Sequence, residues 1–285
     1  MKALFRSFRE IFHRDLVRKM NELQDELCAI SGKLNDLNTP PNNKWEPSTE
    51  EWPLLQQGYA QFGEDLIMAR VLKDFFLVDY LEKVKYLEIG THSPHWSNST
   101  FYFYRKGARG VLVEPNPVFC REIKQIRPED TLIEKGVSFN NEKSMVYYEF
   151  DKEEGRNTFE KEVADQVVRS GIAKVLRKTE LPMVTINEIL ETYFDDNRYF
   201  DILQIDAEGM DFDIIKSMDF SRFHPKVVCM EMGVDVNNHI IDYGKKDMVC
   251  DYMQKINYEC IASTTVNLIF INRGFPKTSV LGKQP

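Results

Sequence analysis

The chain has 285 residues, of which 42% are hydrophobic and 29% charged; 37 lysines and arginines against 45 aspartates and glutamates give a formal net charge of −8. This composition is that of an ordinary globular protein and excludes a disordered chain and a collagen-like repeat. Five scattered cysteines, never in C-x-x-C spacing, predict neither a disulfide framework nor a zinc site and favour a reducing cytoplasm.

Charge is unevenly distributed along the chain. Residues 1–20 carry a net charge of +4 and the remaining residues a net charge of −12. An acidic body predicts no nucleic-acid partner, because neutralising phosphates requires a basic face. No apolar run approaches the roughly 20 residues that cross a bilayer, and charged residues interrupt the N-terminus where a signal peptide would be apolar. The sequence therefore predicts a cytoplasmic protein, at most peripheral to a membrane.

Residues 1–37 are predicted to form an amphipathic, coiled-coil helix. The apolar residues that recur at alternating intervals of four and three, the spacing of a coiled-coil seam, are Leu16, Met20, Leu23, Leu27, Ile30, Leu34 and Leu37. We expect homo-oligomerisation through residues 16–37; packing of the helix on its own domain is the alternative. Phenylalanines and basic side chains in residues 1–20 add the hypothesis of a peripheral contact with an anionic membrane. The proline-rich residues 38–57 are predicted to be a linker.

From residue 58 onward helices and strands are predicted to alternate. Several strands are apolar on both faces, which is typical of a parallel sheet covered by helices on both sides. The predicted strands are 85–90, 110–114, 200–206, 226–232 and two near the C-terminus, and residues 131–139 and 145–150 are predicted to be extended. The predicted helices are 64–77, 97–106, 117–126, 164–176, 186–193, 212–218 and 246–256. This pattern predicts a doubly wound α/β domain over residues 58–275, followed by a tail over residues 276–285.

Acidic residues at the ends of the first two large strands predict a nucleoside-containing cofactor. Glu88 and Glu114 occupy these positions, and ligands of such sheets bind at the carboxyl ends of the strands. A dinucleotide site needs G-x-G-x-x-G, whereas the turn after the first strand has the single glycine Gly90, followed by Thr91, His92, Ser93 and a proline. S-adenosylmethionine (SAM) has no pyrophosphate, and its sulfonium cation would be attracted by Glu88. SAM is therefore favoured over NAD.

A third acidic group, Asp206 and Glu208, follows the strand 200–206. At this edge of the sheet a carboxylate could orient an acceptor hydroxyl, accept its proton or hold a divalent cation. We predict catalytic roles for Asp206, Glu208 and His239, the histidine in a loop after a later strand, and we assign no metal ligands. The simpler alternative is that acidic residues at a helix start complement the helix dipole.

Several stretches, in order, resemble the FkbM-type SAM-dependent methyltransferases. They are QFGEDLIMARVL (61–72), YLEIGTHSPHWSNSTFYFYRKGARGVLVEPNP (86–117), NTF (157–159), LPMVTINEIL (181–190), DILQIDAEGMDFDIIKSMDF (201–220), VVCMEM (227–232) and NLIFI (267–271). The resemblance implies a Rossmann-like class I methyltransferase fold with a seven-stranded, mostly parallel sheet whose last strand is antiparallel. It also implies O-methyl transfer from SAM to a hydroxyl, often of a sugar in a glycan or glycoconjugate.

The resemblance also implies a set of cofactor-binding residues. An N-terminal motif would close over SAM, the first strand and its turn would contact the methionine part, Glu114 the ribose, and residues 136–138 the adenine. The expected residues are Gln61, Glu64, Asp65, Glu88, Gly90, Thr91, Asn98, Thr100, Glu114, Pro115, Gly136, Val137, Ser138 and Asp206.

Two other functions stay open at this point. One is an NAD-linked sugar oxidoreductase or epimerase, which the missing glycines disfavour. The other is a coiled-coil assembly protein whose methyltransferase domain has degenerated, which the retained Glu88, Gly90, Glu114 and Asp206 disfavour. The sequence decides neither the acceptor nor the metal dependence.

Overall fold

The computed structural model describes residues 58–151, 154–194, 199–232, 243–264 and 266–275. The predicted N-terminal helix (1–37), linker (38–57) and C-terminal tail (276–285), and the candidate base His239, lie outside these residues. Among the helices that the structure describes, none combines the length and hydrophobicity that a membrane span requires.

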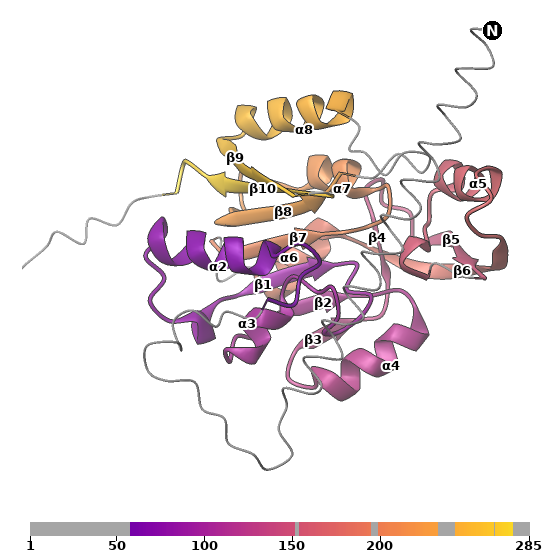
Figure 1. Ribbon diagram of the computed structural model, residues 1–285, viewed down its shortest axis with the longest axis horizontal. Helices are drawn as coiled ribbons and strands as arrows, with labels where there is room; N and C mark the ends of the chain where they lie inside the picture. Colours follow the sequence, from indigo (N-terminus) through magenta and orange to yellow (C-terminus); the bar gives the residue numbers. More distant parts are fainter. Residues whose placement is uncertain (1–57, 152–153, 195–198, 233–242, 265, 276–285) are drawn as a thin grey trace, which may run out of the picture. The chain divides into compact units, whose positions relative to one another are not determined.

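A seven-stranded sheet forms the centre of the described chain, in the order β3-β2-β1-β7-β8-β10-β9 (Figure 1). Its strands are β1 (Tyr86–Ile89), β2 (Val111–Val113), β3 (Thr131–Ile133), β7 (Ile202–Ile205), β8 (Val227–Glu231), β9 (Tyr258–Ser263) and β10 (Asn267–Asn272). The pairs from β3 to β8 are parallel, and β10 runs antiparallel to both of its neighbours. This topology confirms the predicted fold class, a mostly parallel sheet whose last strand is antiparallel.

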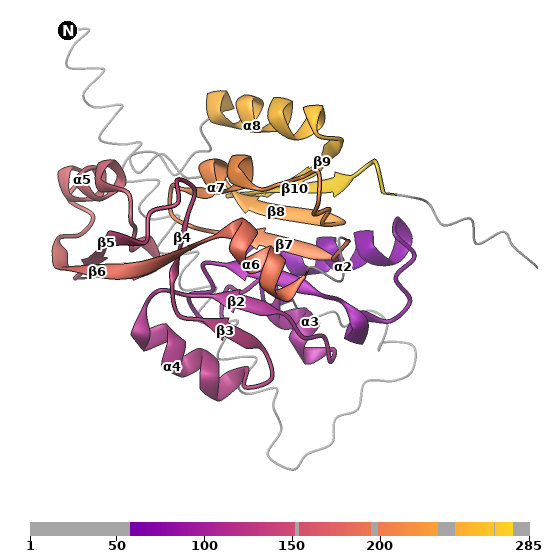
Figure 2. The same cartoon turned by 180° about the vertical axis from the view of Figure 1, so that it is seen from behind.

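Helices cover both faces of this sheet (Figures 1 and 2). They are α2 (Glu64–Asp74), α3 (Phe101–Arg105) and α4 (Pro117–Ile126) on one face, and α6 (Ile186–Tyr193), α7 (Asp211–Ser217) and α8 (Tyr243–Lys255) on the other. Because side chains alternate along a strand, Tyr86 packs under α2 and α3, while Leu87 and Ile89 pack under α6 and α7. The runs that are apolar on both faces are explained by these two separate cores.

A second, three-stranded sheet has the order β4-β6-β5. It consists of β4 (Gly136–Ser138), β5 (Ser144–Phe150) and β6 (Val175–Thr185), with α5 (Lys161–Arg169) packed against it through Ala164 and Val167. Two short 3-10 helices, η2 (Leu81–Lys83) and η3 (Glu154–Arg156), complete the described elements.

The structure refines one sequence prediction in this region and corrects another. The stretch 131–139, predicted to be extended, forms two strands, because the chain bends at Glu134 and Lys135 and passes from the first sheet to the second. The predicted helix 164–176 ends at Arg169, and β6 begins at Val175. The sequence of β6 lacks the alternation of apolar and polar residues that is typical of a strand, because its charged side chains are exposed to solvent. The strand forms through backbone pairing along the full length of β5.

Candidate active site

The turn after β1 lies directly beside the end of β7. Gly90 has a φ of +79°, and a Cβ atom built on it would lie 1.7 Å from the carbonyl oxygen of Asp206. The Asp206 N–H in turn donates to the Ile89 carbonyl oxygen at 2.9 Å. Only glycine fits here, because its neighbour is backbone that cannot move aside. The structure therefore brings together the predicted cofactor turn, residues 90–93, and the predicted catalytic Asp206.

Glu114 fastens this cofactor turn to the start of α4. Its carboxylate accepts hydrogen bonds from the backbone N–H groups of His92 at 2.8 Å and Asn116 at 2.7 Å. Asn116 then caps α4 by accepting from Val118 N–H. Burial raises the pKa of Glu114 to about 7, although the two backbone hydrogen bonds lower it. Pro115 is half-buried between these residues.

One side chain of the cofactor turn, that of Thr91, has a hydrogen-bonding group that the described chain leaves unsatisfied. Its Oγ1 atom is buried and has no hydrogen-bond partner among the described residues. Buried hydroxyls are normally satisfied, so this one is available to a ligand. Together with the buried Glu114 carboxylate and the single close approach at Gly90, it fits a cofactor that has a ribose and no pyrophosphate.

Glu88 is held by donors of the protein itself. It is 2% exposed; its Oε1 accepts from Asn98 Nδ2 at 2.9 Å, and its Oε2 accepts from Thr100 Oγ1 at 2.7 Å and Arg127 Nη1 at 3.3 Å. Glu88, Asn98 and Thr100, three of the predicted cofactor-binding residues, are thus in direct contact with one another. The direct contact between Glu88 and SAM stays a prediction.

The N-terminal motif is fastened to the rest of the fold through its acidic residues. Glu64 is fully buried and accepts from Thr264 Oγ1 at 2.6 Å and Asn267 Nδ2 at 3.0 Å, which ties α2 to β10. Asp65 accepts from the backbone N–H of Tyr59 at 2.5 Å. Gln61 is exposed. Glu64 and Asp65 therefore hold this segment in place, and contacts of all three residues with the cofactor stay predictions.

The predicted adenine segment is the strand β4. Gly136, Val137 and Ser138 are all buried. A Cβ atom on Gly136 would lie 2.5 Å from the Phe159 ring and 2.6 Å from Met183 Sδ, so this glycine lets Phe159 and Met183 pack directly against β4. The adenine contact itself stays a prediction.

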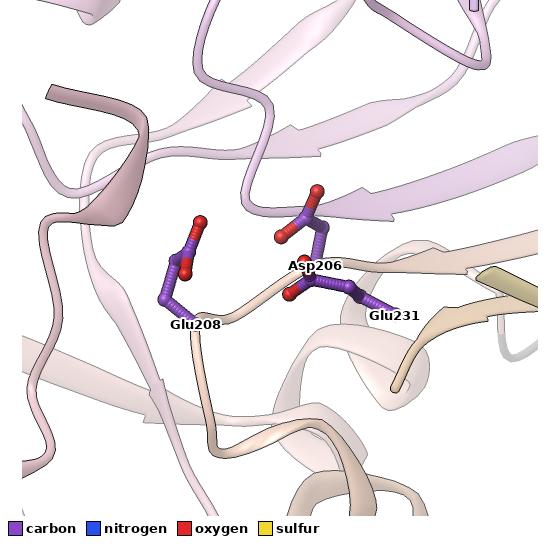
Figure 3. A group of neighbouring side chains, drawn as sticks. All are labelled: Asp206, Glu208 and Glu231. Carbon is purple, nitrogen blue, oxygen red and sulfur yellow. The ribbon is translucent and has the colours of Figure 1, made fainter. Parts of the chain in front are cut away.

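Three carboxyl groups meet at the ends of β7 and β8 (Figure 3). One ligand oxygen each from Asp206, Glu208 and Glu231 lies within 4.8 Å of the other two, and all three residues are half-buried. The parallel pairing of Ile205 with Met230 sets Asp206 and Glu231 side by side. We call these three residues the carboxyl cluster. They are the residues of this site that could hold a divalent cation.

Burial and mutual repulsion keep protons in the carboxyl cluster. Burial, with help from the nearby Asp211, raises the pKa of Asp206 to about 7. Burial and the Asp206 carboxyl group raise the pKa values of Glu208 and Glu231 well above the usual range, although Arg156 opposes the rise at Glu208. The side chains of Asp206 and Glu231 are also hydrogen-bonded to each other, which requires that they share a proton.

The loop that carries Glu208 has an imposed shape. Asp211 accepts from the backbone N–H of Ala207 at 2.8 Å and of Gly209 at 3.1 Å. Glu208 has a φ of +47°, which costs energy for a residue with a side chain, and its carbonyl oxygen accepts from Thr158 Oγ1 at 2.8 Å. These hydrogen bonds from Thr158 and to Asp211 stabilise the strained backbone conformation of Glu208. That conformation directs the Glu208 carboxylate toward the cluster.

The second sheet adds a residue that the sequence predictions missed. Tyr147 on β5 is 5% exposed and packs on Phe159 with ring centroids 4.8 Å apart. Burial raises its pKa, and the carboxylates of Glu114 and Glu208 raise it further. Tyr147 is therefore close enough to Glu114 and to Glu208 of the carboxyl cluster for their charges to act on its hydroxyl group. The NTF stretch, whose Asn157 is hydrogen-bonded to the Tyr147 side chain, is the signal in the sequence that lies nearest to this residue.

Comparison with known proteins settles the family. A sequence model of the methyltransferase FkbM domain matches residues 88–259, more than half of the chain. The chain belongs to the FkbM methyltransferase family. It is therefore a SAM-dependent methyltransferase, which confirms the predicted activity class and cofactor and decides against an NAD-linked oxidoreductase. No protein with curated annotation matches detectably in sequence.

Solved structures with a similar fold include two methyltransferases. Methyltransferase FkbM from Methylobacillus flagellatus is 11% identical; the alignment covers 67% of this chain and 44% of that chain, with a TM-score of 0.36. An O-methyltransferase from Bacillus cereus, solved with S-adenosylhomocysteine (SAH), is 12% identical; the alignment covers 87% of this chain and 88% of that chain, with a TM-score of 0.39. The family assignment rests on the sequence model alone.

Proposed function

We propose that this FkbM-family protein transfers the methyl group of SAM to a hydroxyl group of a sugar in a glycan or glycoconjugate. The observation that carries the proposal is the carboxyl cluster next to the cofactor turn. An attacking hydroxyl must lose its proton, and a carboxylate whose pKa lies near 7 is a suitable acceptor at neutral pH. Carboxylate oxygens also accept hydrogen bonds from the neighbouring hydroxyls that a sugar ring presents.

In this proposal each residue of the carboxyl cluster has a different role. Bound SAM supplies an electrophilic methyl group and leaves as neutral SAH. Asp206, which lies against Gly90, accepts the hydroxyl proton, and Glu231 shares that proton through the hydrogen bond between the two side chains. Glu208 orients the acceptor. Most of the acceleration then comes from holding the acceptor oxygen in line with the methyl group.

The test uses SAM with a deuterated methyl group. The full-length protein is incubated with a panel of oligosaccharides and glycolipids, and the products are analysed by mass spectrometry. We expect the label in an alkali-stable ether on a sugar, and no label with Asp206→Asn. Label found only on nitrogen, on an alkali-labile ester or on polypeptide would contradict the proposal.

A metal-removal arm separates the two uses of the carboxyl cluster. If Asp206 acts as a base, activity persists in EDTA. Activity that is lost in EDTA and returns with added Mg²⁺ would instead assign Asp206, Glu208 and Glu231 to a divalent cation that binds the acceptor hydroxyls.

A further inference from the structure

A fully buried arginine lies beneath the cofactor turn. Arg127 follows α4 and is 1% exposed. Burying a charge is unfavourable unless hydrogen bonds and an opposite charge compensate for it, and here every donor group has a partner. The acceptors are Asp130 Oδ2 (2.8 Å), Asn98 Oδ1 (3.1 Å), Glu88 Oε2 (3.3 Å), Tyr86 OH (3.1 Å) and Thr100 Oγ1 (2.8 Å).

The guanidinium group keeps its charge in this position. Burial lowers the pKa of Arg127, but the Glu88 carboxylate, then Tyr86 and Asp130, raise it by more. The face of the group is also enclosed by aromatic rings: the Cζ atom lies 5.5 Å from the Tyr86 ring centroid and 5.4 Å from that of Tyr104, which is within the range of cation–π attraction.

Asn98 connects this charge to the cofactor turn. Its Oδ1 accepts from Arg127 Nη1, and its Nδ2 donates to the carbonyl oxygens of Thr91 at 3.3 Å and Ser93 at 3.1 Å and to Glu88 Oε1 at 2.9 Å. An asparagine amide has one accepting and one donating end. Asn98 Oδ1 also accepts from the backbone N–H groups of Phe101 at 2.8 Å and Thr100 at 3.1 Å. Arg127 is therefore one of three N–H donors, and the only charged one, that hold the accepting end of Asn98 and direct its donating end toward the turn.

The cofactor turn is thus held from two directions. Glu114 accepts from the N–H of His92 on one side, and Asn98 donates to the carbonyl oxygens of Thr91 and Ser93 on the other. Without Arg127, the Asn98 amide loses its charged donor and keeps the two backbone donors. The Glu88 carboxylate loses the guanidinium that keeps its pKa from rising further on burial. Both changes loosen the turn next to the free Thr91 hydroxyl.

We propose that Arg127 is a positioning residue for cofactor binding, which acts through Asn98 and Glu88 on the turn that receives SAM. The inference concerns the cofactor and does not depend on the identity of the acceptor. It separates Arg127 from a buried apolar residue of α4 such as Ile123, whose loss destabilises the fold without a specific effect on the turn.

The test is the affinity for SAH, measured by calorimetry well below the unfolding temperature of every variant. Loss of hydrogen bonds to charged groups predicts that Arg127→Met binds SAH at least about tenfold more weakly. Arg127→Lys, which keeps the charge, should lose less. Since Arg127 acts in part through Asn98, the loss of binding free energy in the double variant Arg127→Met/Asn98→Ala should be smaller than the sum of the losses in the two single variants.

Ile123→Ala is the matched control. Ile123 lies on the same helix, is fully buried and has no contact with the turn that the structure records, so this variant should unfold more readily yet bind SAH like the wild type. Wild-type affinity in Arg127→Met, or an equal loss in Ile123→Ala, would overturn the proposal. Additive losses in the double variant would overturn the route through Asn98. If Arg127→Met does not fold, the other two single variants provide the test. Wild-type SAH affinity in both Arg127→Lys and Asn98→Ala would then overturn the proposal.

Discussion

Replacing Asp206 with asparagine should change activity and stability in opposite directions. The side chain keeps its size and can still donate a hydrogen bond to Glu231, but it can neither carry charge nor accept the proton of an acceptor hydroxyl. Turnover should therefore fall by at least about 100-fold, the usual contribution of a general base. SAH affinity should fall by much less than turnover, because the cofactor turn contacts the Asp206 backbone, which the substitution leaves in place.

The stability effect follows from the raised pKa of Asp206. Burial and the nearby Asp211 raise this pKa from 3.8 to about 7, so the folded state holds the proton more tightly than the unfolded state does. The stability that this group contributes is complete below pH 4 and is lost as the pH rises toward 7. At about 1.4 kcal/mol for each pKa unit, the loss is on the order of 4 kcal/mol, an upper figure because Glu231 shares the proton.

The asparagine variant should not show this loss of stability with rising pH. The difference in free energy of unfolding between the variant and the wild type should be constant below pH 4, rise by up to about 4 kcal/mol between pH 4 and 7, and be constant again above pH 7. Urea denaturation of both proteins at several pH values measures the difference. Only the pH-dependent part is used, because any change in hydrogen bonding adds a constant.

Glu149→Gln is a control of opposite sign. Hydrogen bonds from Arg177 lower the pKa of Glu149, so its stabilising contribution is present above the unfolded pKa and is lost as the pH falls. This variant should be least stable, relative to the wild type, at neutral pH. If the difference between Asp206→Asn and the wild type does not depend on pH, the buried, proton-sharing cluster is wrong; undiminished turnover would remove Asp206 as the base.

Three further predictions test the cofactor site and the N-terminal segment. Glu114→Ala should weaken SAH binding at least about tenfold in calorimetry, because it removes the acceptor of His92 N–H and the predicted ribose ligand; unchanged affinity, or tight NAD binding by the wild type, would contradict this. Gly90→Ala should lose more than about 4 kcal/mol of unfolding free energy or fail to fold, because its φ is +79° and the new Cβ would meet the Asp206 carbonyl oxygen; wild-type stability would refute the geometry. If residues 16–37 form a coiled coil, light scattering should give a larger oligomer for the full chain than for one that starts at Trp52, and vesicles of anionic lipid should bind only the full chain; equal monomeric masses and absent binding would refute the two ideas respectively.

The central sheet could be predicted because its signals are local. Runs such as Val111–Val113 and Ile202–Ile205 are apolar on both faces, and that pattern has few solutions other than a parallel strand between two layers of helices. The second sheet lacked such a signal. The strand β6 is rich in charged side chains that point to solvent, and its pairing with β5 comes from backbone groups, which the sequence pattern does not display.

The candidate site could be predicted only where a residue's position along its own strand was enough. Asp206 and Glu114 were found because both follow apolar strands. Glu231 was missed because its significance depends on β8 lying next to β7, and strand order is a tertiary property. Arg127 was missed for a similar reason: a basic residue near the end of a helix is usually a solvent-exposed complement to the helix dipole, and only the packed structure shows that it is buried.

The second sheet belongs to the site, although it lies beside the main fold. The second sheet and the loop after β5 reach the residues discussed here. Thr158 Oγ1 donates to the Glu208 carbonyl oxygen, the charges of Glu114 and Glu208 raise the pKa of Tyr147, and Gly155 lies close enough to His92 that an added Cβ atom would be 4.0 Å from the His92 ring. The cofactor turn and the carboxyl cluster come from the main sheet, whose arrangement any enzyme of this fold must keep to bind SAM. Segments inserted between its strands are free to differ, because they carry no part of the parallel sheet. Differences in acceptor between related enzymes should therefore be encoded in residues 139–185 more than in the strands that carry Glu88, Glu114 and Asp206.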